Sequence, residues 1–291
     1  MSGGLFGIVL LASGSFALGL CIGSFLNVVV HRLPLGQSLV FPGSHCPGCD
    51  HAIAPYDNIP VVSYLWLGGM CRHCETKISW RYPAVEMLTG LLFLGVALRF
   101  GFTLETPLWM IFSAALVAAA GIDIDYQIIP DEISLGGLVF GLLAAPFVFV
   151  QMGAPLGDAV RHAVLGGLVG GGTFWVVGFA HARLSVAMGR EFEHWPEEGE
   201  ELPKPSSFDY WTWFPGLGFG DVKLLAMIGV FLGPIGVLTA IVVASLVGLA
   251  IGVGWGLATR SYASPFGFAP AIAAGALLVL LAPPSLQLFA L

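Results

Sequence analysis

Long apolar runs constrain the fold of this chain more than any other feature. Each run is long enough, or nearly so, to cross the hydrocarbon core of a bilayer as an α-helix. The runs lie at about 5–30, 83–100, 106–122, 133–152, 161–182, 221–234, 235–258 and 267–288. Only 10% of the 291 residues are charged, whereas soluble domains carry about a quarter. The sequence therefore predicts an all-α polytopic membrane protein with about eight transmembrane helices.

The distribution of basic residues predicts an orientation for these helices. The sixth and seventh runs are separated only by Gly233-Pro234, so eight spans require a tight turn there and seven is the alternative count. With eight spans, only Arg99 and Arg161 fall on one side of the membrane. Nine basic residues fall on the other side: Arg32, Arg72, Lys77, Arg81, Arg183, Arg190, Lys204, Lys223 and Arg260. Because basic residues concentrate in cytoplasmic loops, we expect residues 31–82 to be cytoplasmic and both termini to lie outside.

Residues 31–82 form a polar segment after the first helix, 1–30, and contain four of the five cysteines. They occur as Cys46-Pro-Gly-Cys49 and Cys71-Arg-His-Cys74, with 21 residues between the two knuckles. This spacing is typical of a tetrathiolate zinc ribbon. Disulfides are disfavoured by the reducing cytoplasm, and a redox role by the duplicated motif. We expect a structural zinc ion whose binding supplies folding energy to a segment with little apolar core.

Carboxylates lie at the ends of two apolar runs, far apart in the sequence. Asp123-Ile-Asp125 ends the third run, and Gly218-Phe-Gly220-Asp221 opens the sixth. A charge at such a position is costly unless it has a partner or a function, and the glycines permit close backbone approach. Asp123 and Asp125 point about 200° apart on a helix, so only one of them can face a given partner. The topology brings Asp123 and Asp221 to one face, which favours acid–base hydrolysis at the bilayer surface over a solvated turn.

Three further polar residues near these ends are candidates for site support or substrate contact. Asn27 either hydrogen-bonds between helices or shapes the site. Glu86 either supports the site, with Arg81 as its partner, or is a charge favoured by the helix dipole. Lys223 is two residues from Asp221 and is expected to face the lipid headgroups.

A second polar loop, 185–217, is acidic in its middle and aromatic at its end. The acidic residues are Glu191, Glu193, Glu197, Glu198, Glu200, Glu201 and Asp209, and the aromatic ones are Trp195, Tyr210, Trp211, Trp213 and Phe214. Such a loop is either solvated with an interfacial aromatic belt, or a docking surface for a basic, membrane-anchored segment. The net charge of −7 argues against a nucleic-acid partner.

The motifs together resemble the type IV prepilin peptidase family over nearly the whole chain. The resemblance rests on Gly23-Ser-Phe-Leu-Asn27-Val, His31-Arg-Leu-Pro34, the cysteine knuckles, Ile78-Ser-Trp-Arg81-Tyr-Pro83, Asp123-Ile-Asp125 with Pro130-Asp131, Gly218-Phe-Gly-Asp221-Val-Lys223 and Pro265-Phe-Gly267. It implies an aspartic protease domain at 83–291, in which Asp221 is the aspartate of a Gly-x-Gly-Asp motif. Asp123 is the preferred partner, seven residues before Pro130 as in shorter relatives, and Asp125 is the fallback.

The resemblance also implies substrates, a cofactor and a location. The substrates are prepilins or pseudopilins that carry a basic leader, a glycine at the cut and an apolar helix just after it. S-adenosylmethionine is implied as the donor for N-methylation of the new terminus. The enzyme is expected in the bacterial inner membrane, in contact with lipid, with its active site at the cytoplasmic face. A proton-coupled transporter and a non-catalytic envelope scaffold are the alternatives from other classes.

Overall fold

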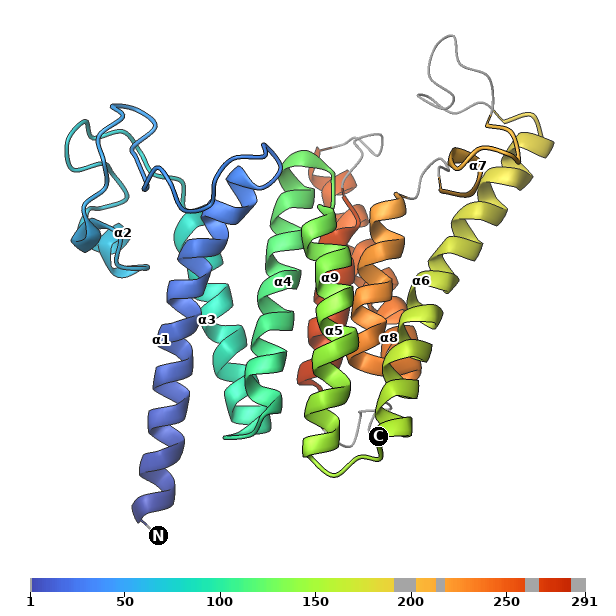
Figure 1. Cartoon of the computed structure of the whole chain (residues 1–291). Helices are drawn as coiled ribbons and strands as arrows, with labels where there is room; N and C mark the ends of the chain where they lie inside the picture. Colours follow the sequence, from blue (N-terminus) through green and yellow to red (C-terminus); the bar gives the residue numbers. More distant parts are fainter. Residues whose placement is uncertain (1, 191–202, 213–217, 260–266, 284–291) are drawn as a thin grey trace. The chain divides into compact units, whose positions relative to one another are not determined.

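The structure is a computed structural model that describes residues 2–190, 203–212, 218–259 and 267–283 (Figure 1). The described residues are helical or irregular; they contain two isolated β-bridges and no extended strand. The all-α prediction is therefore confirmed for the described part of the chain. The chain divides into two compact units, 1–128 and 129–291.

The first unit contains three long helices and the cysteine-bearing segment. Helix α1 spans Ser2–Arg32, α3 spans Arg81–Phe100 and α4 spans Glu105–Tyr126, and the three helices contact one another. The approach of α1 to α3 is close because a Cβ on Gly23 would lie 2.6 Å from the Cα of Glu86. Between α1 and α3 lie a 3-10 helix, η1 (Pro55–Asp57), and the short helix α2 (Val62–Trp66).

The second unit is built around α8. It contains α5 (Asp131–Gln151), α6 (Leu156–Ala187), α7 (Asp209–Thr212), α8 (Phe219–Thr259) and α9 (Ala269–Leu281). Helices α5, α6 and α9 all contact α8. A Cβ on Gly166 of α6 would lie only 1.9 Å from the carbonyl oxygen of Gly229 in α8, so glycine permits backbone contact between these two helices.

Helix α8 is broken at Gly233, the position at which the eight-span alternative requires a turn. Gly233 has φ 73° and ψ −179°, a conformation open only to glycine. A Cβ on Gly170 would lie 2.2 Å from the oxygen of Leu225 and 2.9 Å from Val237. In a straight helix these two residues would be about 18 Å apart. The first part of α8, 219–232, is therefore a short helix that folds back on the second part.

The number of membrane spans differs from the expected eight. Six described helices are long and apolar enough to cross a bilayer: α1, α3, α4, α5, α6 and α8. Helix α9 is apolar but has only 13 residues, and each part of the broken α8 is counted within a single apolar helix. The eight spans are not confirmed, because apolar length alone does not separate a full span from half of a broken helix. The chain is a multi-pass membrane protein.

Candidate active site

Asp221 lies in the first turn of α8 in the second unit. Its backbone N–H donates a hydrogen bond to the Gly218 carbonyl oxygen at 3.0 Å, and the residue is 8% exposed. A Cβ on Gly220 would lie 3.2 Å from Ile129, so a small residue is needed where the chain preceding α5 crosses this turn. The partial positive charge of the helix N-terminus stabilises an anion at this position. The turn therefore holds a mostly buried carboxylate at the positive end of a helix dipole.

Lys223 forms an ion pair with Asp131, the first residue of α5. Its ammonium also lies 5.8 Å from the centre of the Phe219 ring. The expectation that Lys223 faces the lipid headgroups stays a prediction, and the structure adds Asp131 as its partner. The ion pair ties the start of α8 to the start of α5, and sequence reasoning missed it because the partners are 92 residues apart.

The Asp-Ile-Asp triplet ends α4 in the first unit, and its two carboxylates differ in environment. Asp123 is 5% exposed, whereas Asp125 is exposed and forms an ion pair with Arg81. The Arg81 guanidinium also donates to the Gly121 carbonyl oxygen at 3.1 Å. The helix stops at Gln127, which adopts a left-handed conformation and donates its N–H to the Asp123 carbonyl oxygen. Arg81 thus fixes the last turn of α4 by binding Asp125, which lies two residues after Asp123.

Glu86 is buried in α3, but Arg81 is not its partner, so that expected pairing is wrong. The Glu86 carboxylate accepts a hydrogen bond from the backbone N–H of Val61 at 2.7 Å. Residues five apart on a helix point about 140° apart, which separates the two side chains on α3. Glu86 therefore connects α3 to the segment just before α2.

Asn27 hydrogen-bonds between helices, as one of the two interpretations of this residue predicts. Its side-chain amide donates to the Tyr82 carbonyl oxygen at 3.2 Å. The hydroxyl of Tyr126 donates to the His31 carbonyl oxygen at 3.3 Å. These bonds connect the end of α1 to the start of α3 and the end of α4, so the three helix ends form one frame.

The four cysteine thiols of the first unit form a compact cluster. The Sγ atoms of Cys46, Cys49, Cys71 and Cys74 all lie within 4.8 Å of one another, and those of Cys46 and Cys74 are 3.6 Å apart. Tetrahedral zinc with bonds of about 2.3 Å places its sulfur ligands about 3.8 Å apart. The residues present therefore fit a tetrathiolate metal site.

The backbone around the thiols is that of two similar knuckles. The N–H groups of Gly48 and His73 donate to the Sγ atoms of Cys46 and Cys71, each at 3.4 Å. Hydrogen bonding with Thr76, a residue not predicted to contribute, lowers the pKa of the Cys74 thiol to about 6. The thiolate form of Cys74, which is the form that binds metal, is thereby favoured.

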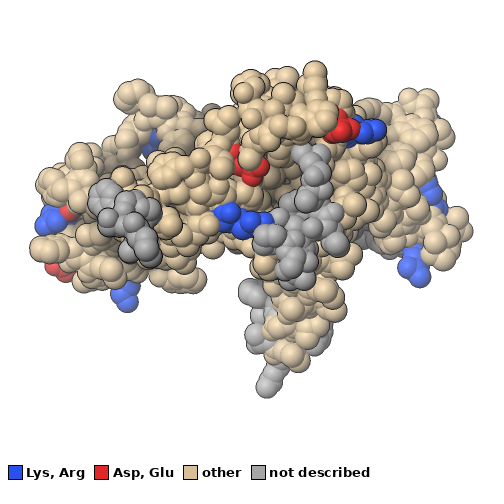
Figure 2. Space-filling model, turned by 90° about the horizontal axis from the view of Figure 1, so that it is seen from below, with Lys and Arg blue, Asp and Glu red and all other residues tan. Residues whose placement is uncertain are grey.

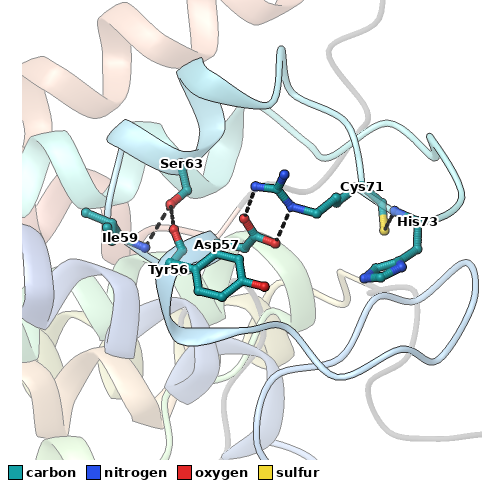
Figure 3. A network of polar contacts seen from close by, with 7 residues as sticks. Tyr56, Asp57, Ile59, Ser63, Cys71 and His73 are labelled. Atoms are coloured by element: carbon teal, nitrogen blue, oxygen red, sulfur yellow. Dashed lines mark hydrogen bonds and ion pairs between the residues drawn. The ribbon is translucent and has the colours of Figure 1, made fainter.

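An ion pair joins the second knuckle to η1. The Arg72 guanidinium binds both carboxylate oxygens of Asp57, at 2.6 and 2.9 Å, and this hydrogen bonding keeps the pKa of Asp57 below its usual range. Figure 3 shows the pair beside Cys71 and His73. The rings of His51 and His73 lie 3.7 Å apart at their centres, next to the thiols.

The second polar loop is described only in part. The acidic residues from Glu191 to Glu201, together with Trp195, Trp213 and Phe214, lie outside the described residues. In α7, Trp211 stacks on Phe179 of α6 at 5.3 Å between ring centres. The Arg183 guanidinium lies 3.8 Å from the centre of the Tyr210 ring. The described end of this loop is thus held against α6 by aromatic contacts.

Comparison with known proteins gives a consistent family assignment. Residues 17–100 match the bacterial peptidase A24 N-terminal domain, and residues 110–253 match the type IV leader peptidase family. Prepilin leader peptidase/N-methyltransferases of three bacteria are similar to the chain. The protein of Myxococcus xanthus is 40% identical over 84% of this chain and 63% of its own length, so the chain spans less than two thirds of that relative.

The chain matches a larger share of the length of two other relatives. The Pseudomonas aeruginosa protein is 38% identical over 81% of this chain and 78% of its own length. The Aeromonas hydrophila protein is 34% identical over 91% of this chain and 89% of its own length. No solved structure matches the chain. The matched domains, together with these relatives, place the chain in the type IV leader peptidase family.

Proposed function

We infer that this chain is a prepilin leader peptidase and N-methyltransferase: it cleaves the leader from type IV prepilins or pseudopilins and methylates the new N-terminus. The observation that carries this inference is the match to both family domains, with relatives of that name over most of the chain. The terminal positions of Asp123 and Asp221 in α4 and α8 do not favour a transporter, which places its carboxylates near the bilayer midplane. The peptidase domain of this proposal spans 83–291.

The proposed catalytic pair is Asp123 and Asp221. Two carboxylates that meet share one proton, because both cannot be ionised at short range. Asp221 lies at a helix N-terminus and Asp123 at a helix C-terminus, and the helix dipole stabilises an anion only at the former. We therefore assign Asp221 as the base that takes a proton from the attacking water. Asp123 is the acid that protonates the carbonyl oxygen. Asp221 then passes the proton taken from water to the leaving amine, and Asp123 regains its proton from the hydroxyl of the tetrahedral intermediate as that intermediate collapses.

The flanking residues have supporting roles in this proposal. Gly218 and Gly220 let the substrate backbone approach Asp221, and Lys223 fixes the turn through Asp131. Glu86 and Asn27 hold α3 and its neighbours in place. Asp123 is preferred to Asp125 as the partner of Asp221 because Asp123 is buried, whereas Asp125 is exposed.

The substrate and location follow from the same chemistry. A prepilin with an apolar helix after the cleavage site can keep that helix in the bilayer while its basic leader meets acidic loop residues of the enzyme. The scissile bond then lies near the helix ends that carry the aspartates. We place this site at the cytoplasmic face of the bacterial inner membrane, following the distribution of basic residues.

The proposed function involves two cofactors, a structural zinc ion and S-adenosylmethionine. Zinc bound by Cys46, Cys49, Cys71 and Cys74 stabilises the segment between α1 and α3, which has little core of its own. S-adenosylmethionine supplies the methyl group that is transferred to the new terminal amine.

The test is cleavage of a prepilin by the purified chain in lipid nanodiscs. Asp123→Asn and Asp221→Asn should each abolish cleavage while zinc content and thermal stability stay as in the wild type. Asp125→Asn should keep more activity than Asp123→Asn, and the reverse order would identify Asp125 as the partner. Full cleavage by both the Asp123 and the Asp221 variants would refute the aspartic mechanism.

A further inference from the structure

Helix α2 presents its apolar side chains outward and its polar side chain inward. Val62, Leu65 and Trp66 are 55%, 71% and 82% exposed, and their spacing of three and four residues places them on one face. Ser63 is 7% exposed. A water-soluble domain has the opposite arrangement, so the exposed face of α2 fits an apolar environment.

Polar contacts on the inner side fix this orientation. The Ser63 hydroxyl accepts a hydrogen bond from the Ile59 N–H and donates one to the Tyr56 carbonyl oxygen, both at 2.9 Å. Figure 3 shows these two bonds beside the ion pair of Asp57 and Arg72. Since both bonds of Ser63 are made inward, turning the apolar face of α2 toward the domain would break them.

A second contact fixes the position of α2 along the axis of α3. The N–H of Val61, the residue before α2, donates to the Glu86 carboxylate. Glu86 lies five residues after Arg81, the first residue of α3, and therefore about 7.5 Å along the helix axis. Helix α3 is a candidate membrane span. Figure 1 accordingly draws α2 below the level at which α1 ends. The start of α2 thus lies beside the first turns of α3, within the reach of one glutamate side chain.

The residues that flank α2 in sequence are uncharged, and the first turns of α3 also expose apolar side chains. The segment 58–71 carries no charged residue. Trp80 and Tyr82, at the start of α3, are exposed, as are Leu88 and Leu91 further along the same helix. Exposed Trp and Tyr are typical of the membrane–water interface, and exposed leucines of the lipid-facing side of a span.

We propose that the exposed face of α2, formed by Val62, Leu65 and Trp66, inserts into the phospholipid interface and anchors the cysteine-bearing segment to the bilayer. The occupant is lipid because the residue before α2 is bound to Glu86 in the second turn of α3, a candidate membrane span, which places the face at the depth of the first turns of that span. A short apolar helix with Trp at the headgroup boundary is an interfacial anchor. This inference stands whether or not the chain is a peptidase.

Photo-crosslinking in lipid nanodiscs tests the proposal. Benzoylphenylalanine replaces Trp66 in the full chain, in nanodiscs of phosphatidylethanolamine and phosphatidylglycerol, with the same label at Pro47 as control. Pro47 is also exposed but lies in the first cysteine knuckle. We expect phospholipid adducts at position 66 and none at position 47 by mass spectrometry. Absence of lipid adducts at 66, equal yield at both positions, or adducts at 66 only to an added prepilin would overturn the proposal.

Tryptophan fluorescence gives a second measurement that does not depend on the bulky label. Lipids brominated near the headgroup end of the acyl chain quench nearby indoles, so the wild type should lose more emission than Trp66→Phe in the same nanodiscs. Trp66→Phe keeps an aromatic ring and disturbs the fold little. Equal fractional quenching of the two proteins would show that Trp66 does not reach the lipid.

Discussion

The contact between α6 and α8 gives the sharpest structural prediction, because a single methyl group tests it. In Gly166→Ala the added Cβ would lie 1.9 Å from the Gly229 oxygen, and ordinary van der Waals contact begins at 3.4 Å. The two helix backbones must therefore separate by about 1.5 Å. Gly172→Ala, on the same helix, is the matched control, since nothing lies within 4 Å of its Cβ.

The expected change in the free energy of unfolding is the difference between two opposing effects. Overpacking costs about 1–3 kcal/mol, whereas replacing glycine by alanine in a helix gains about 1 kcal/mol. Gly166→Ala should therefore lower the free energy of unfolding slightly, and Gly172→Ala should leave it unchanged or raise it. Gly229 lies eight residues after Asp221 in the first part of α8. A shift of about 1 Å at a catalytic group costs roughly 100-fold in rate. We therefore expect a large loss of activity together with only a small loss of stability.

The assay compares thermal unfolding and kcat/KM for prepilin cleavage in the same nanodiscs. We expect Gly166→Ala to lose roughly 100-fold in kcat/KM with a small decrease in Tm, and Gly172→Ala to retain both. If the two variants cleave equally well, the backbone contact between α6 and α8 does not position Asp221, and the reasoning is wrong.

Three further outcomes are expected. Cys46→Ser should lose bound zinc by metal analysis and expose the segment 31–82 to proteolysis; a wild type without zinc would contradict this. Arg81→Lys should lower kcat more than it raises KM, because lysine cannot bind both Asp125 and a backbone oxygen in the manner of a guanidinium; an unchanged kcat would remove Arg81 as a positioning residue. For Lys223 and Asp131, a double-mutant cycle on unfolding should give about 0.2–1 kcal/mol, because the pair is partly exposed; a coupling of zero would mean that the pair does not hold α8 to α5.

The features that the sequence predicts well are those set by short-range pattern. The cysteine knuckles bring their own geometry, since each is closed by local backbone bonds such as Cys46 N–H to His51 O and Cys71 N–H to Thr76 O. The break at Gly233-Pro234 is one of the two alternatives that these two residues allow. Apolar runs gave the helices themselves, because a backbone in lipid must satisfy its own hydrogen bonds.

Long-range partners were harder to predict. The Glu86 carboxylate binds a backbone N–H, and because every residue but proline carries that donor, the sequence does not mark Val61 as the partner. The assignment of Arg81 to Glu86 could have been rejected from helical geometry alone. The partner of Arg81, Asp125, lies on a different helix, and only the packing of α3 against α4 reveals it.

The ion pairs divide the four acidic residues at the ends of α4, α5 and α8 into two kinds. Asp125 and Asp131 are each neutralised by a basic residue, Arg81 and Lys223 respectively, whereas Asp123 and Asp221 are the buried ones. The pair with Arg81 neutralises a charge two residues from Asp123, and the pair with Lys223 neutralises one beside the first turn of α8, which carries Asp221. Within each unit, charge neutralisation and positioning of the helix end are therefore performed by the same ion pair.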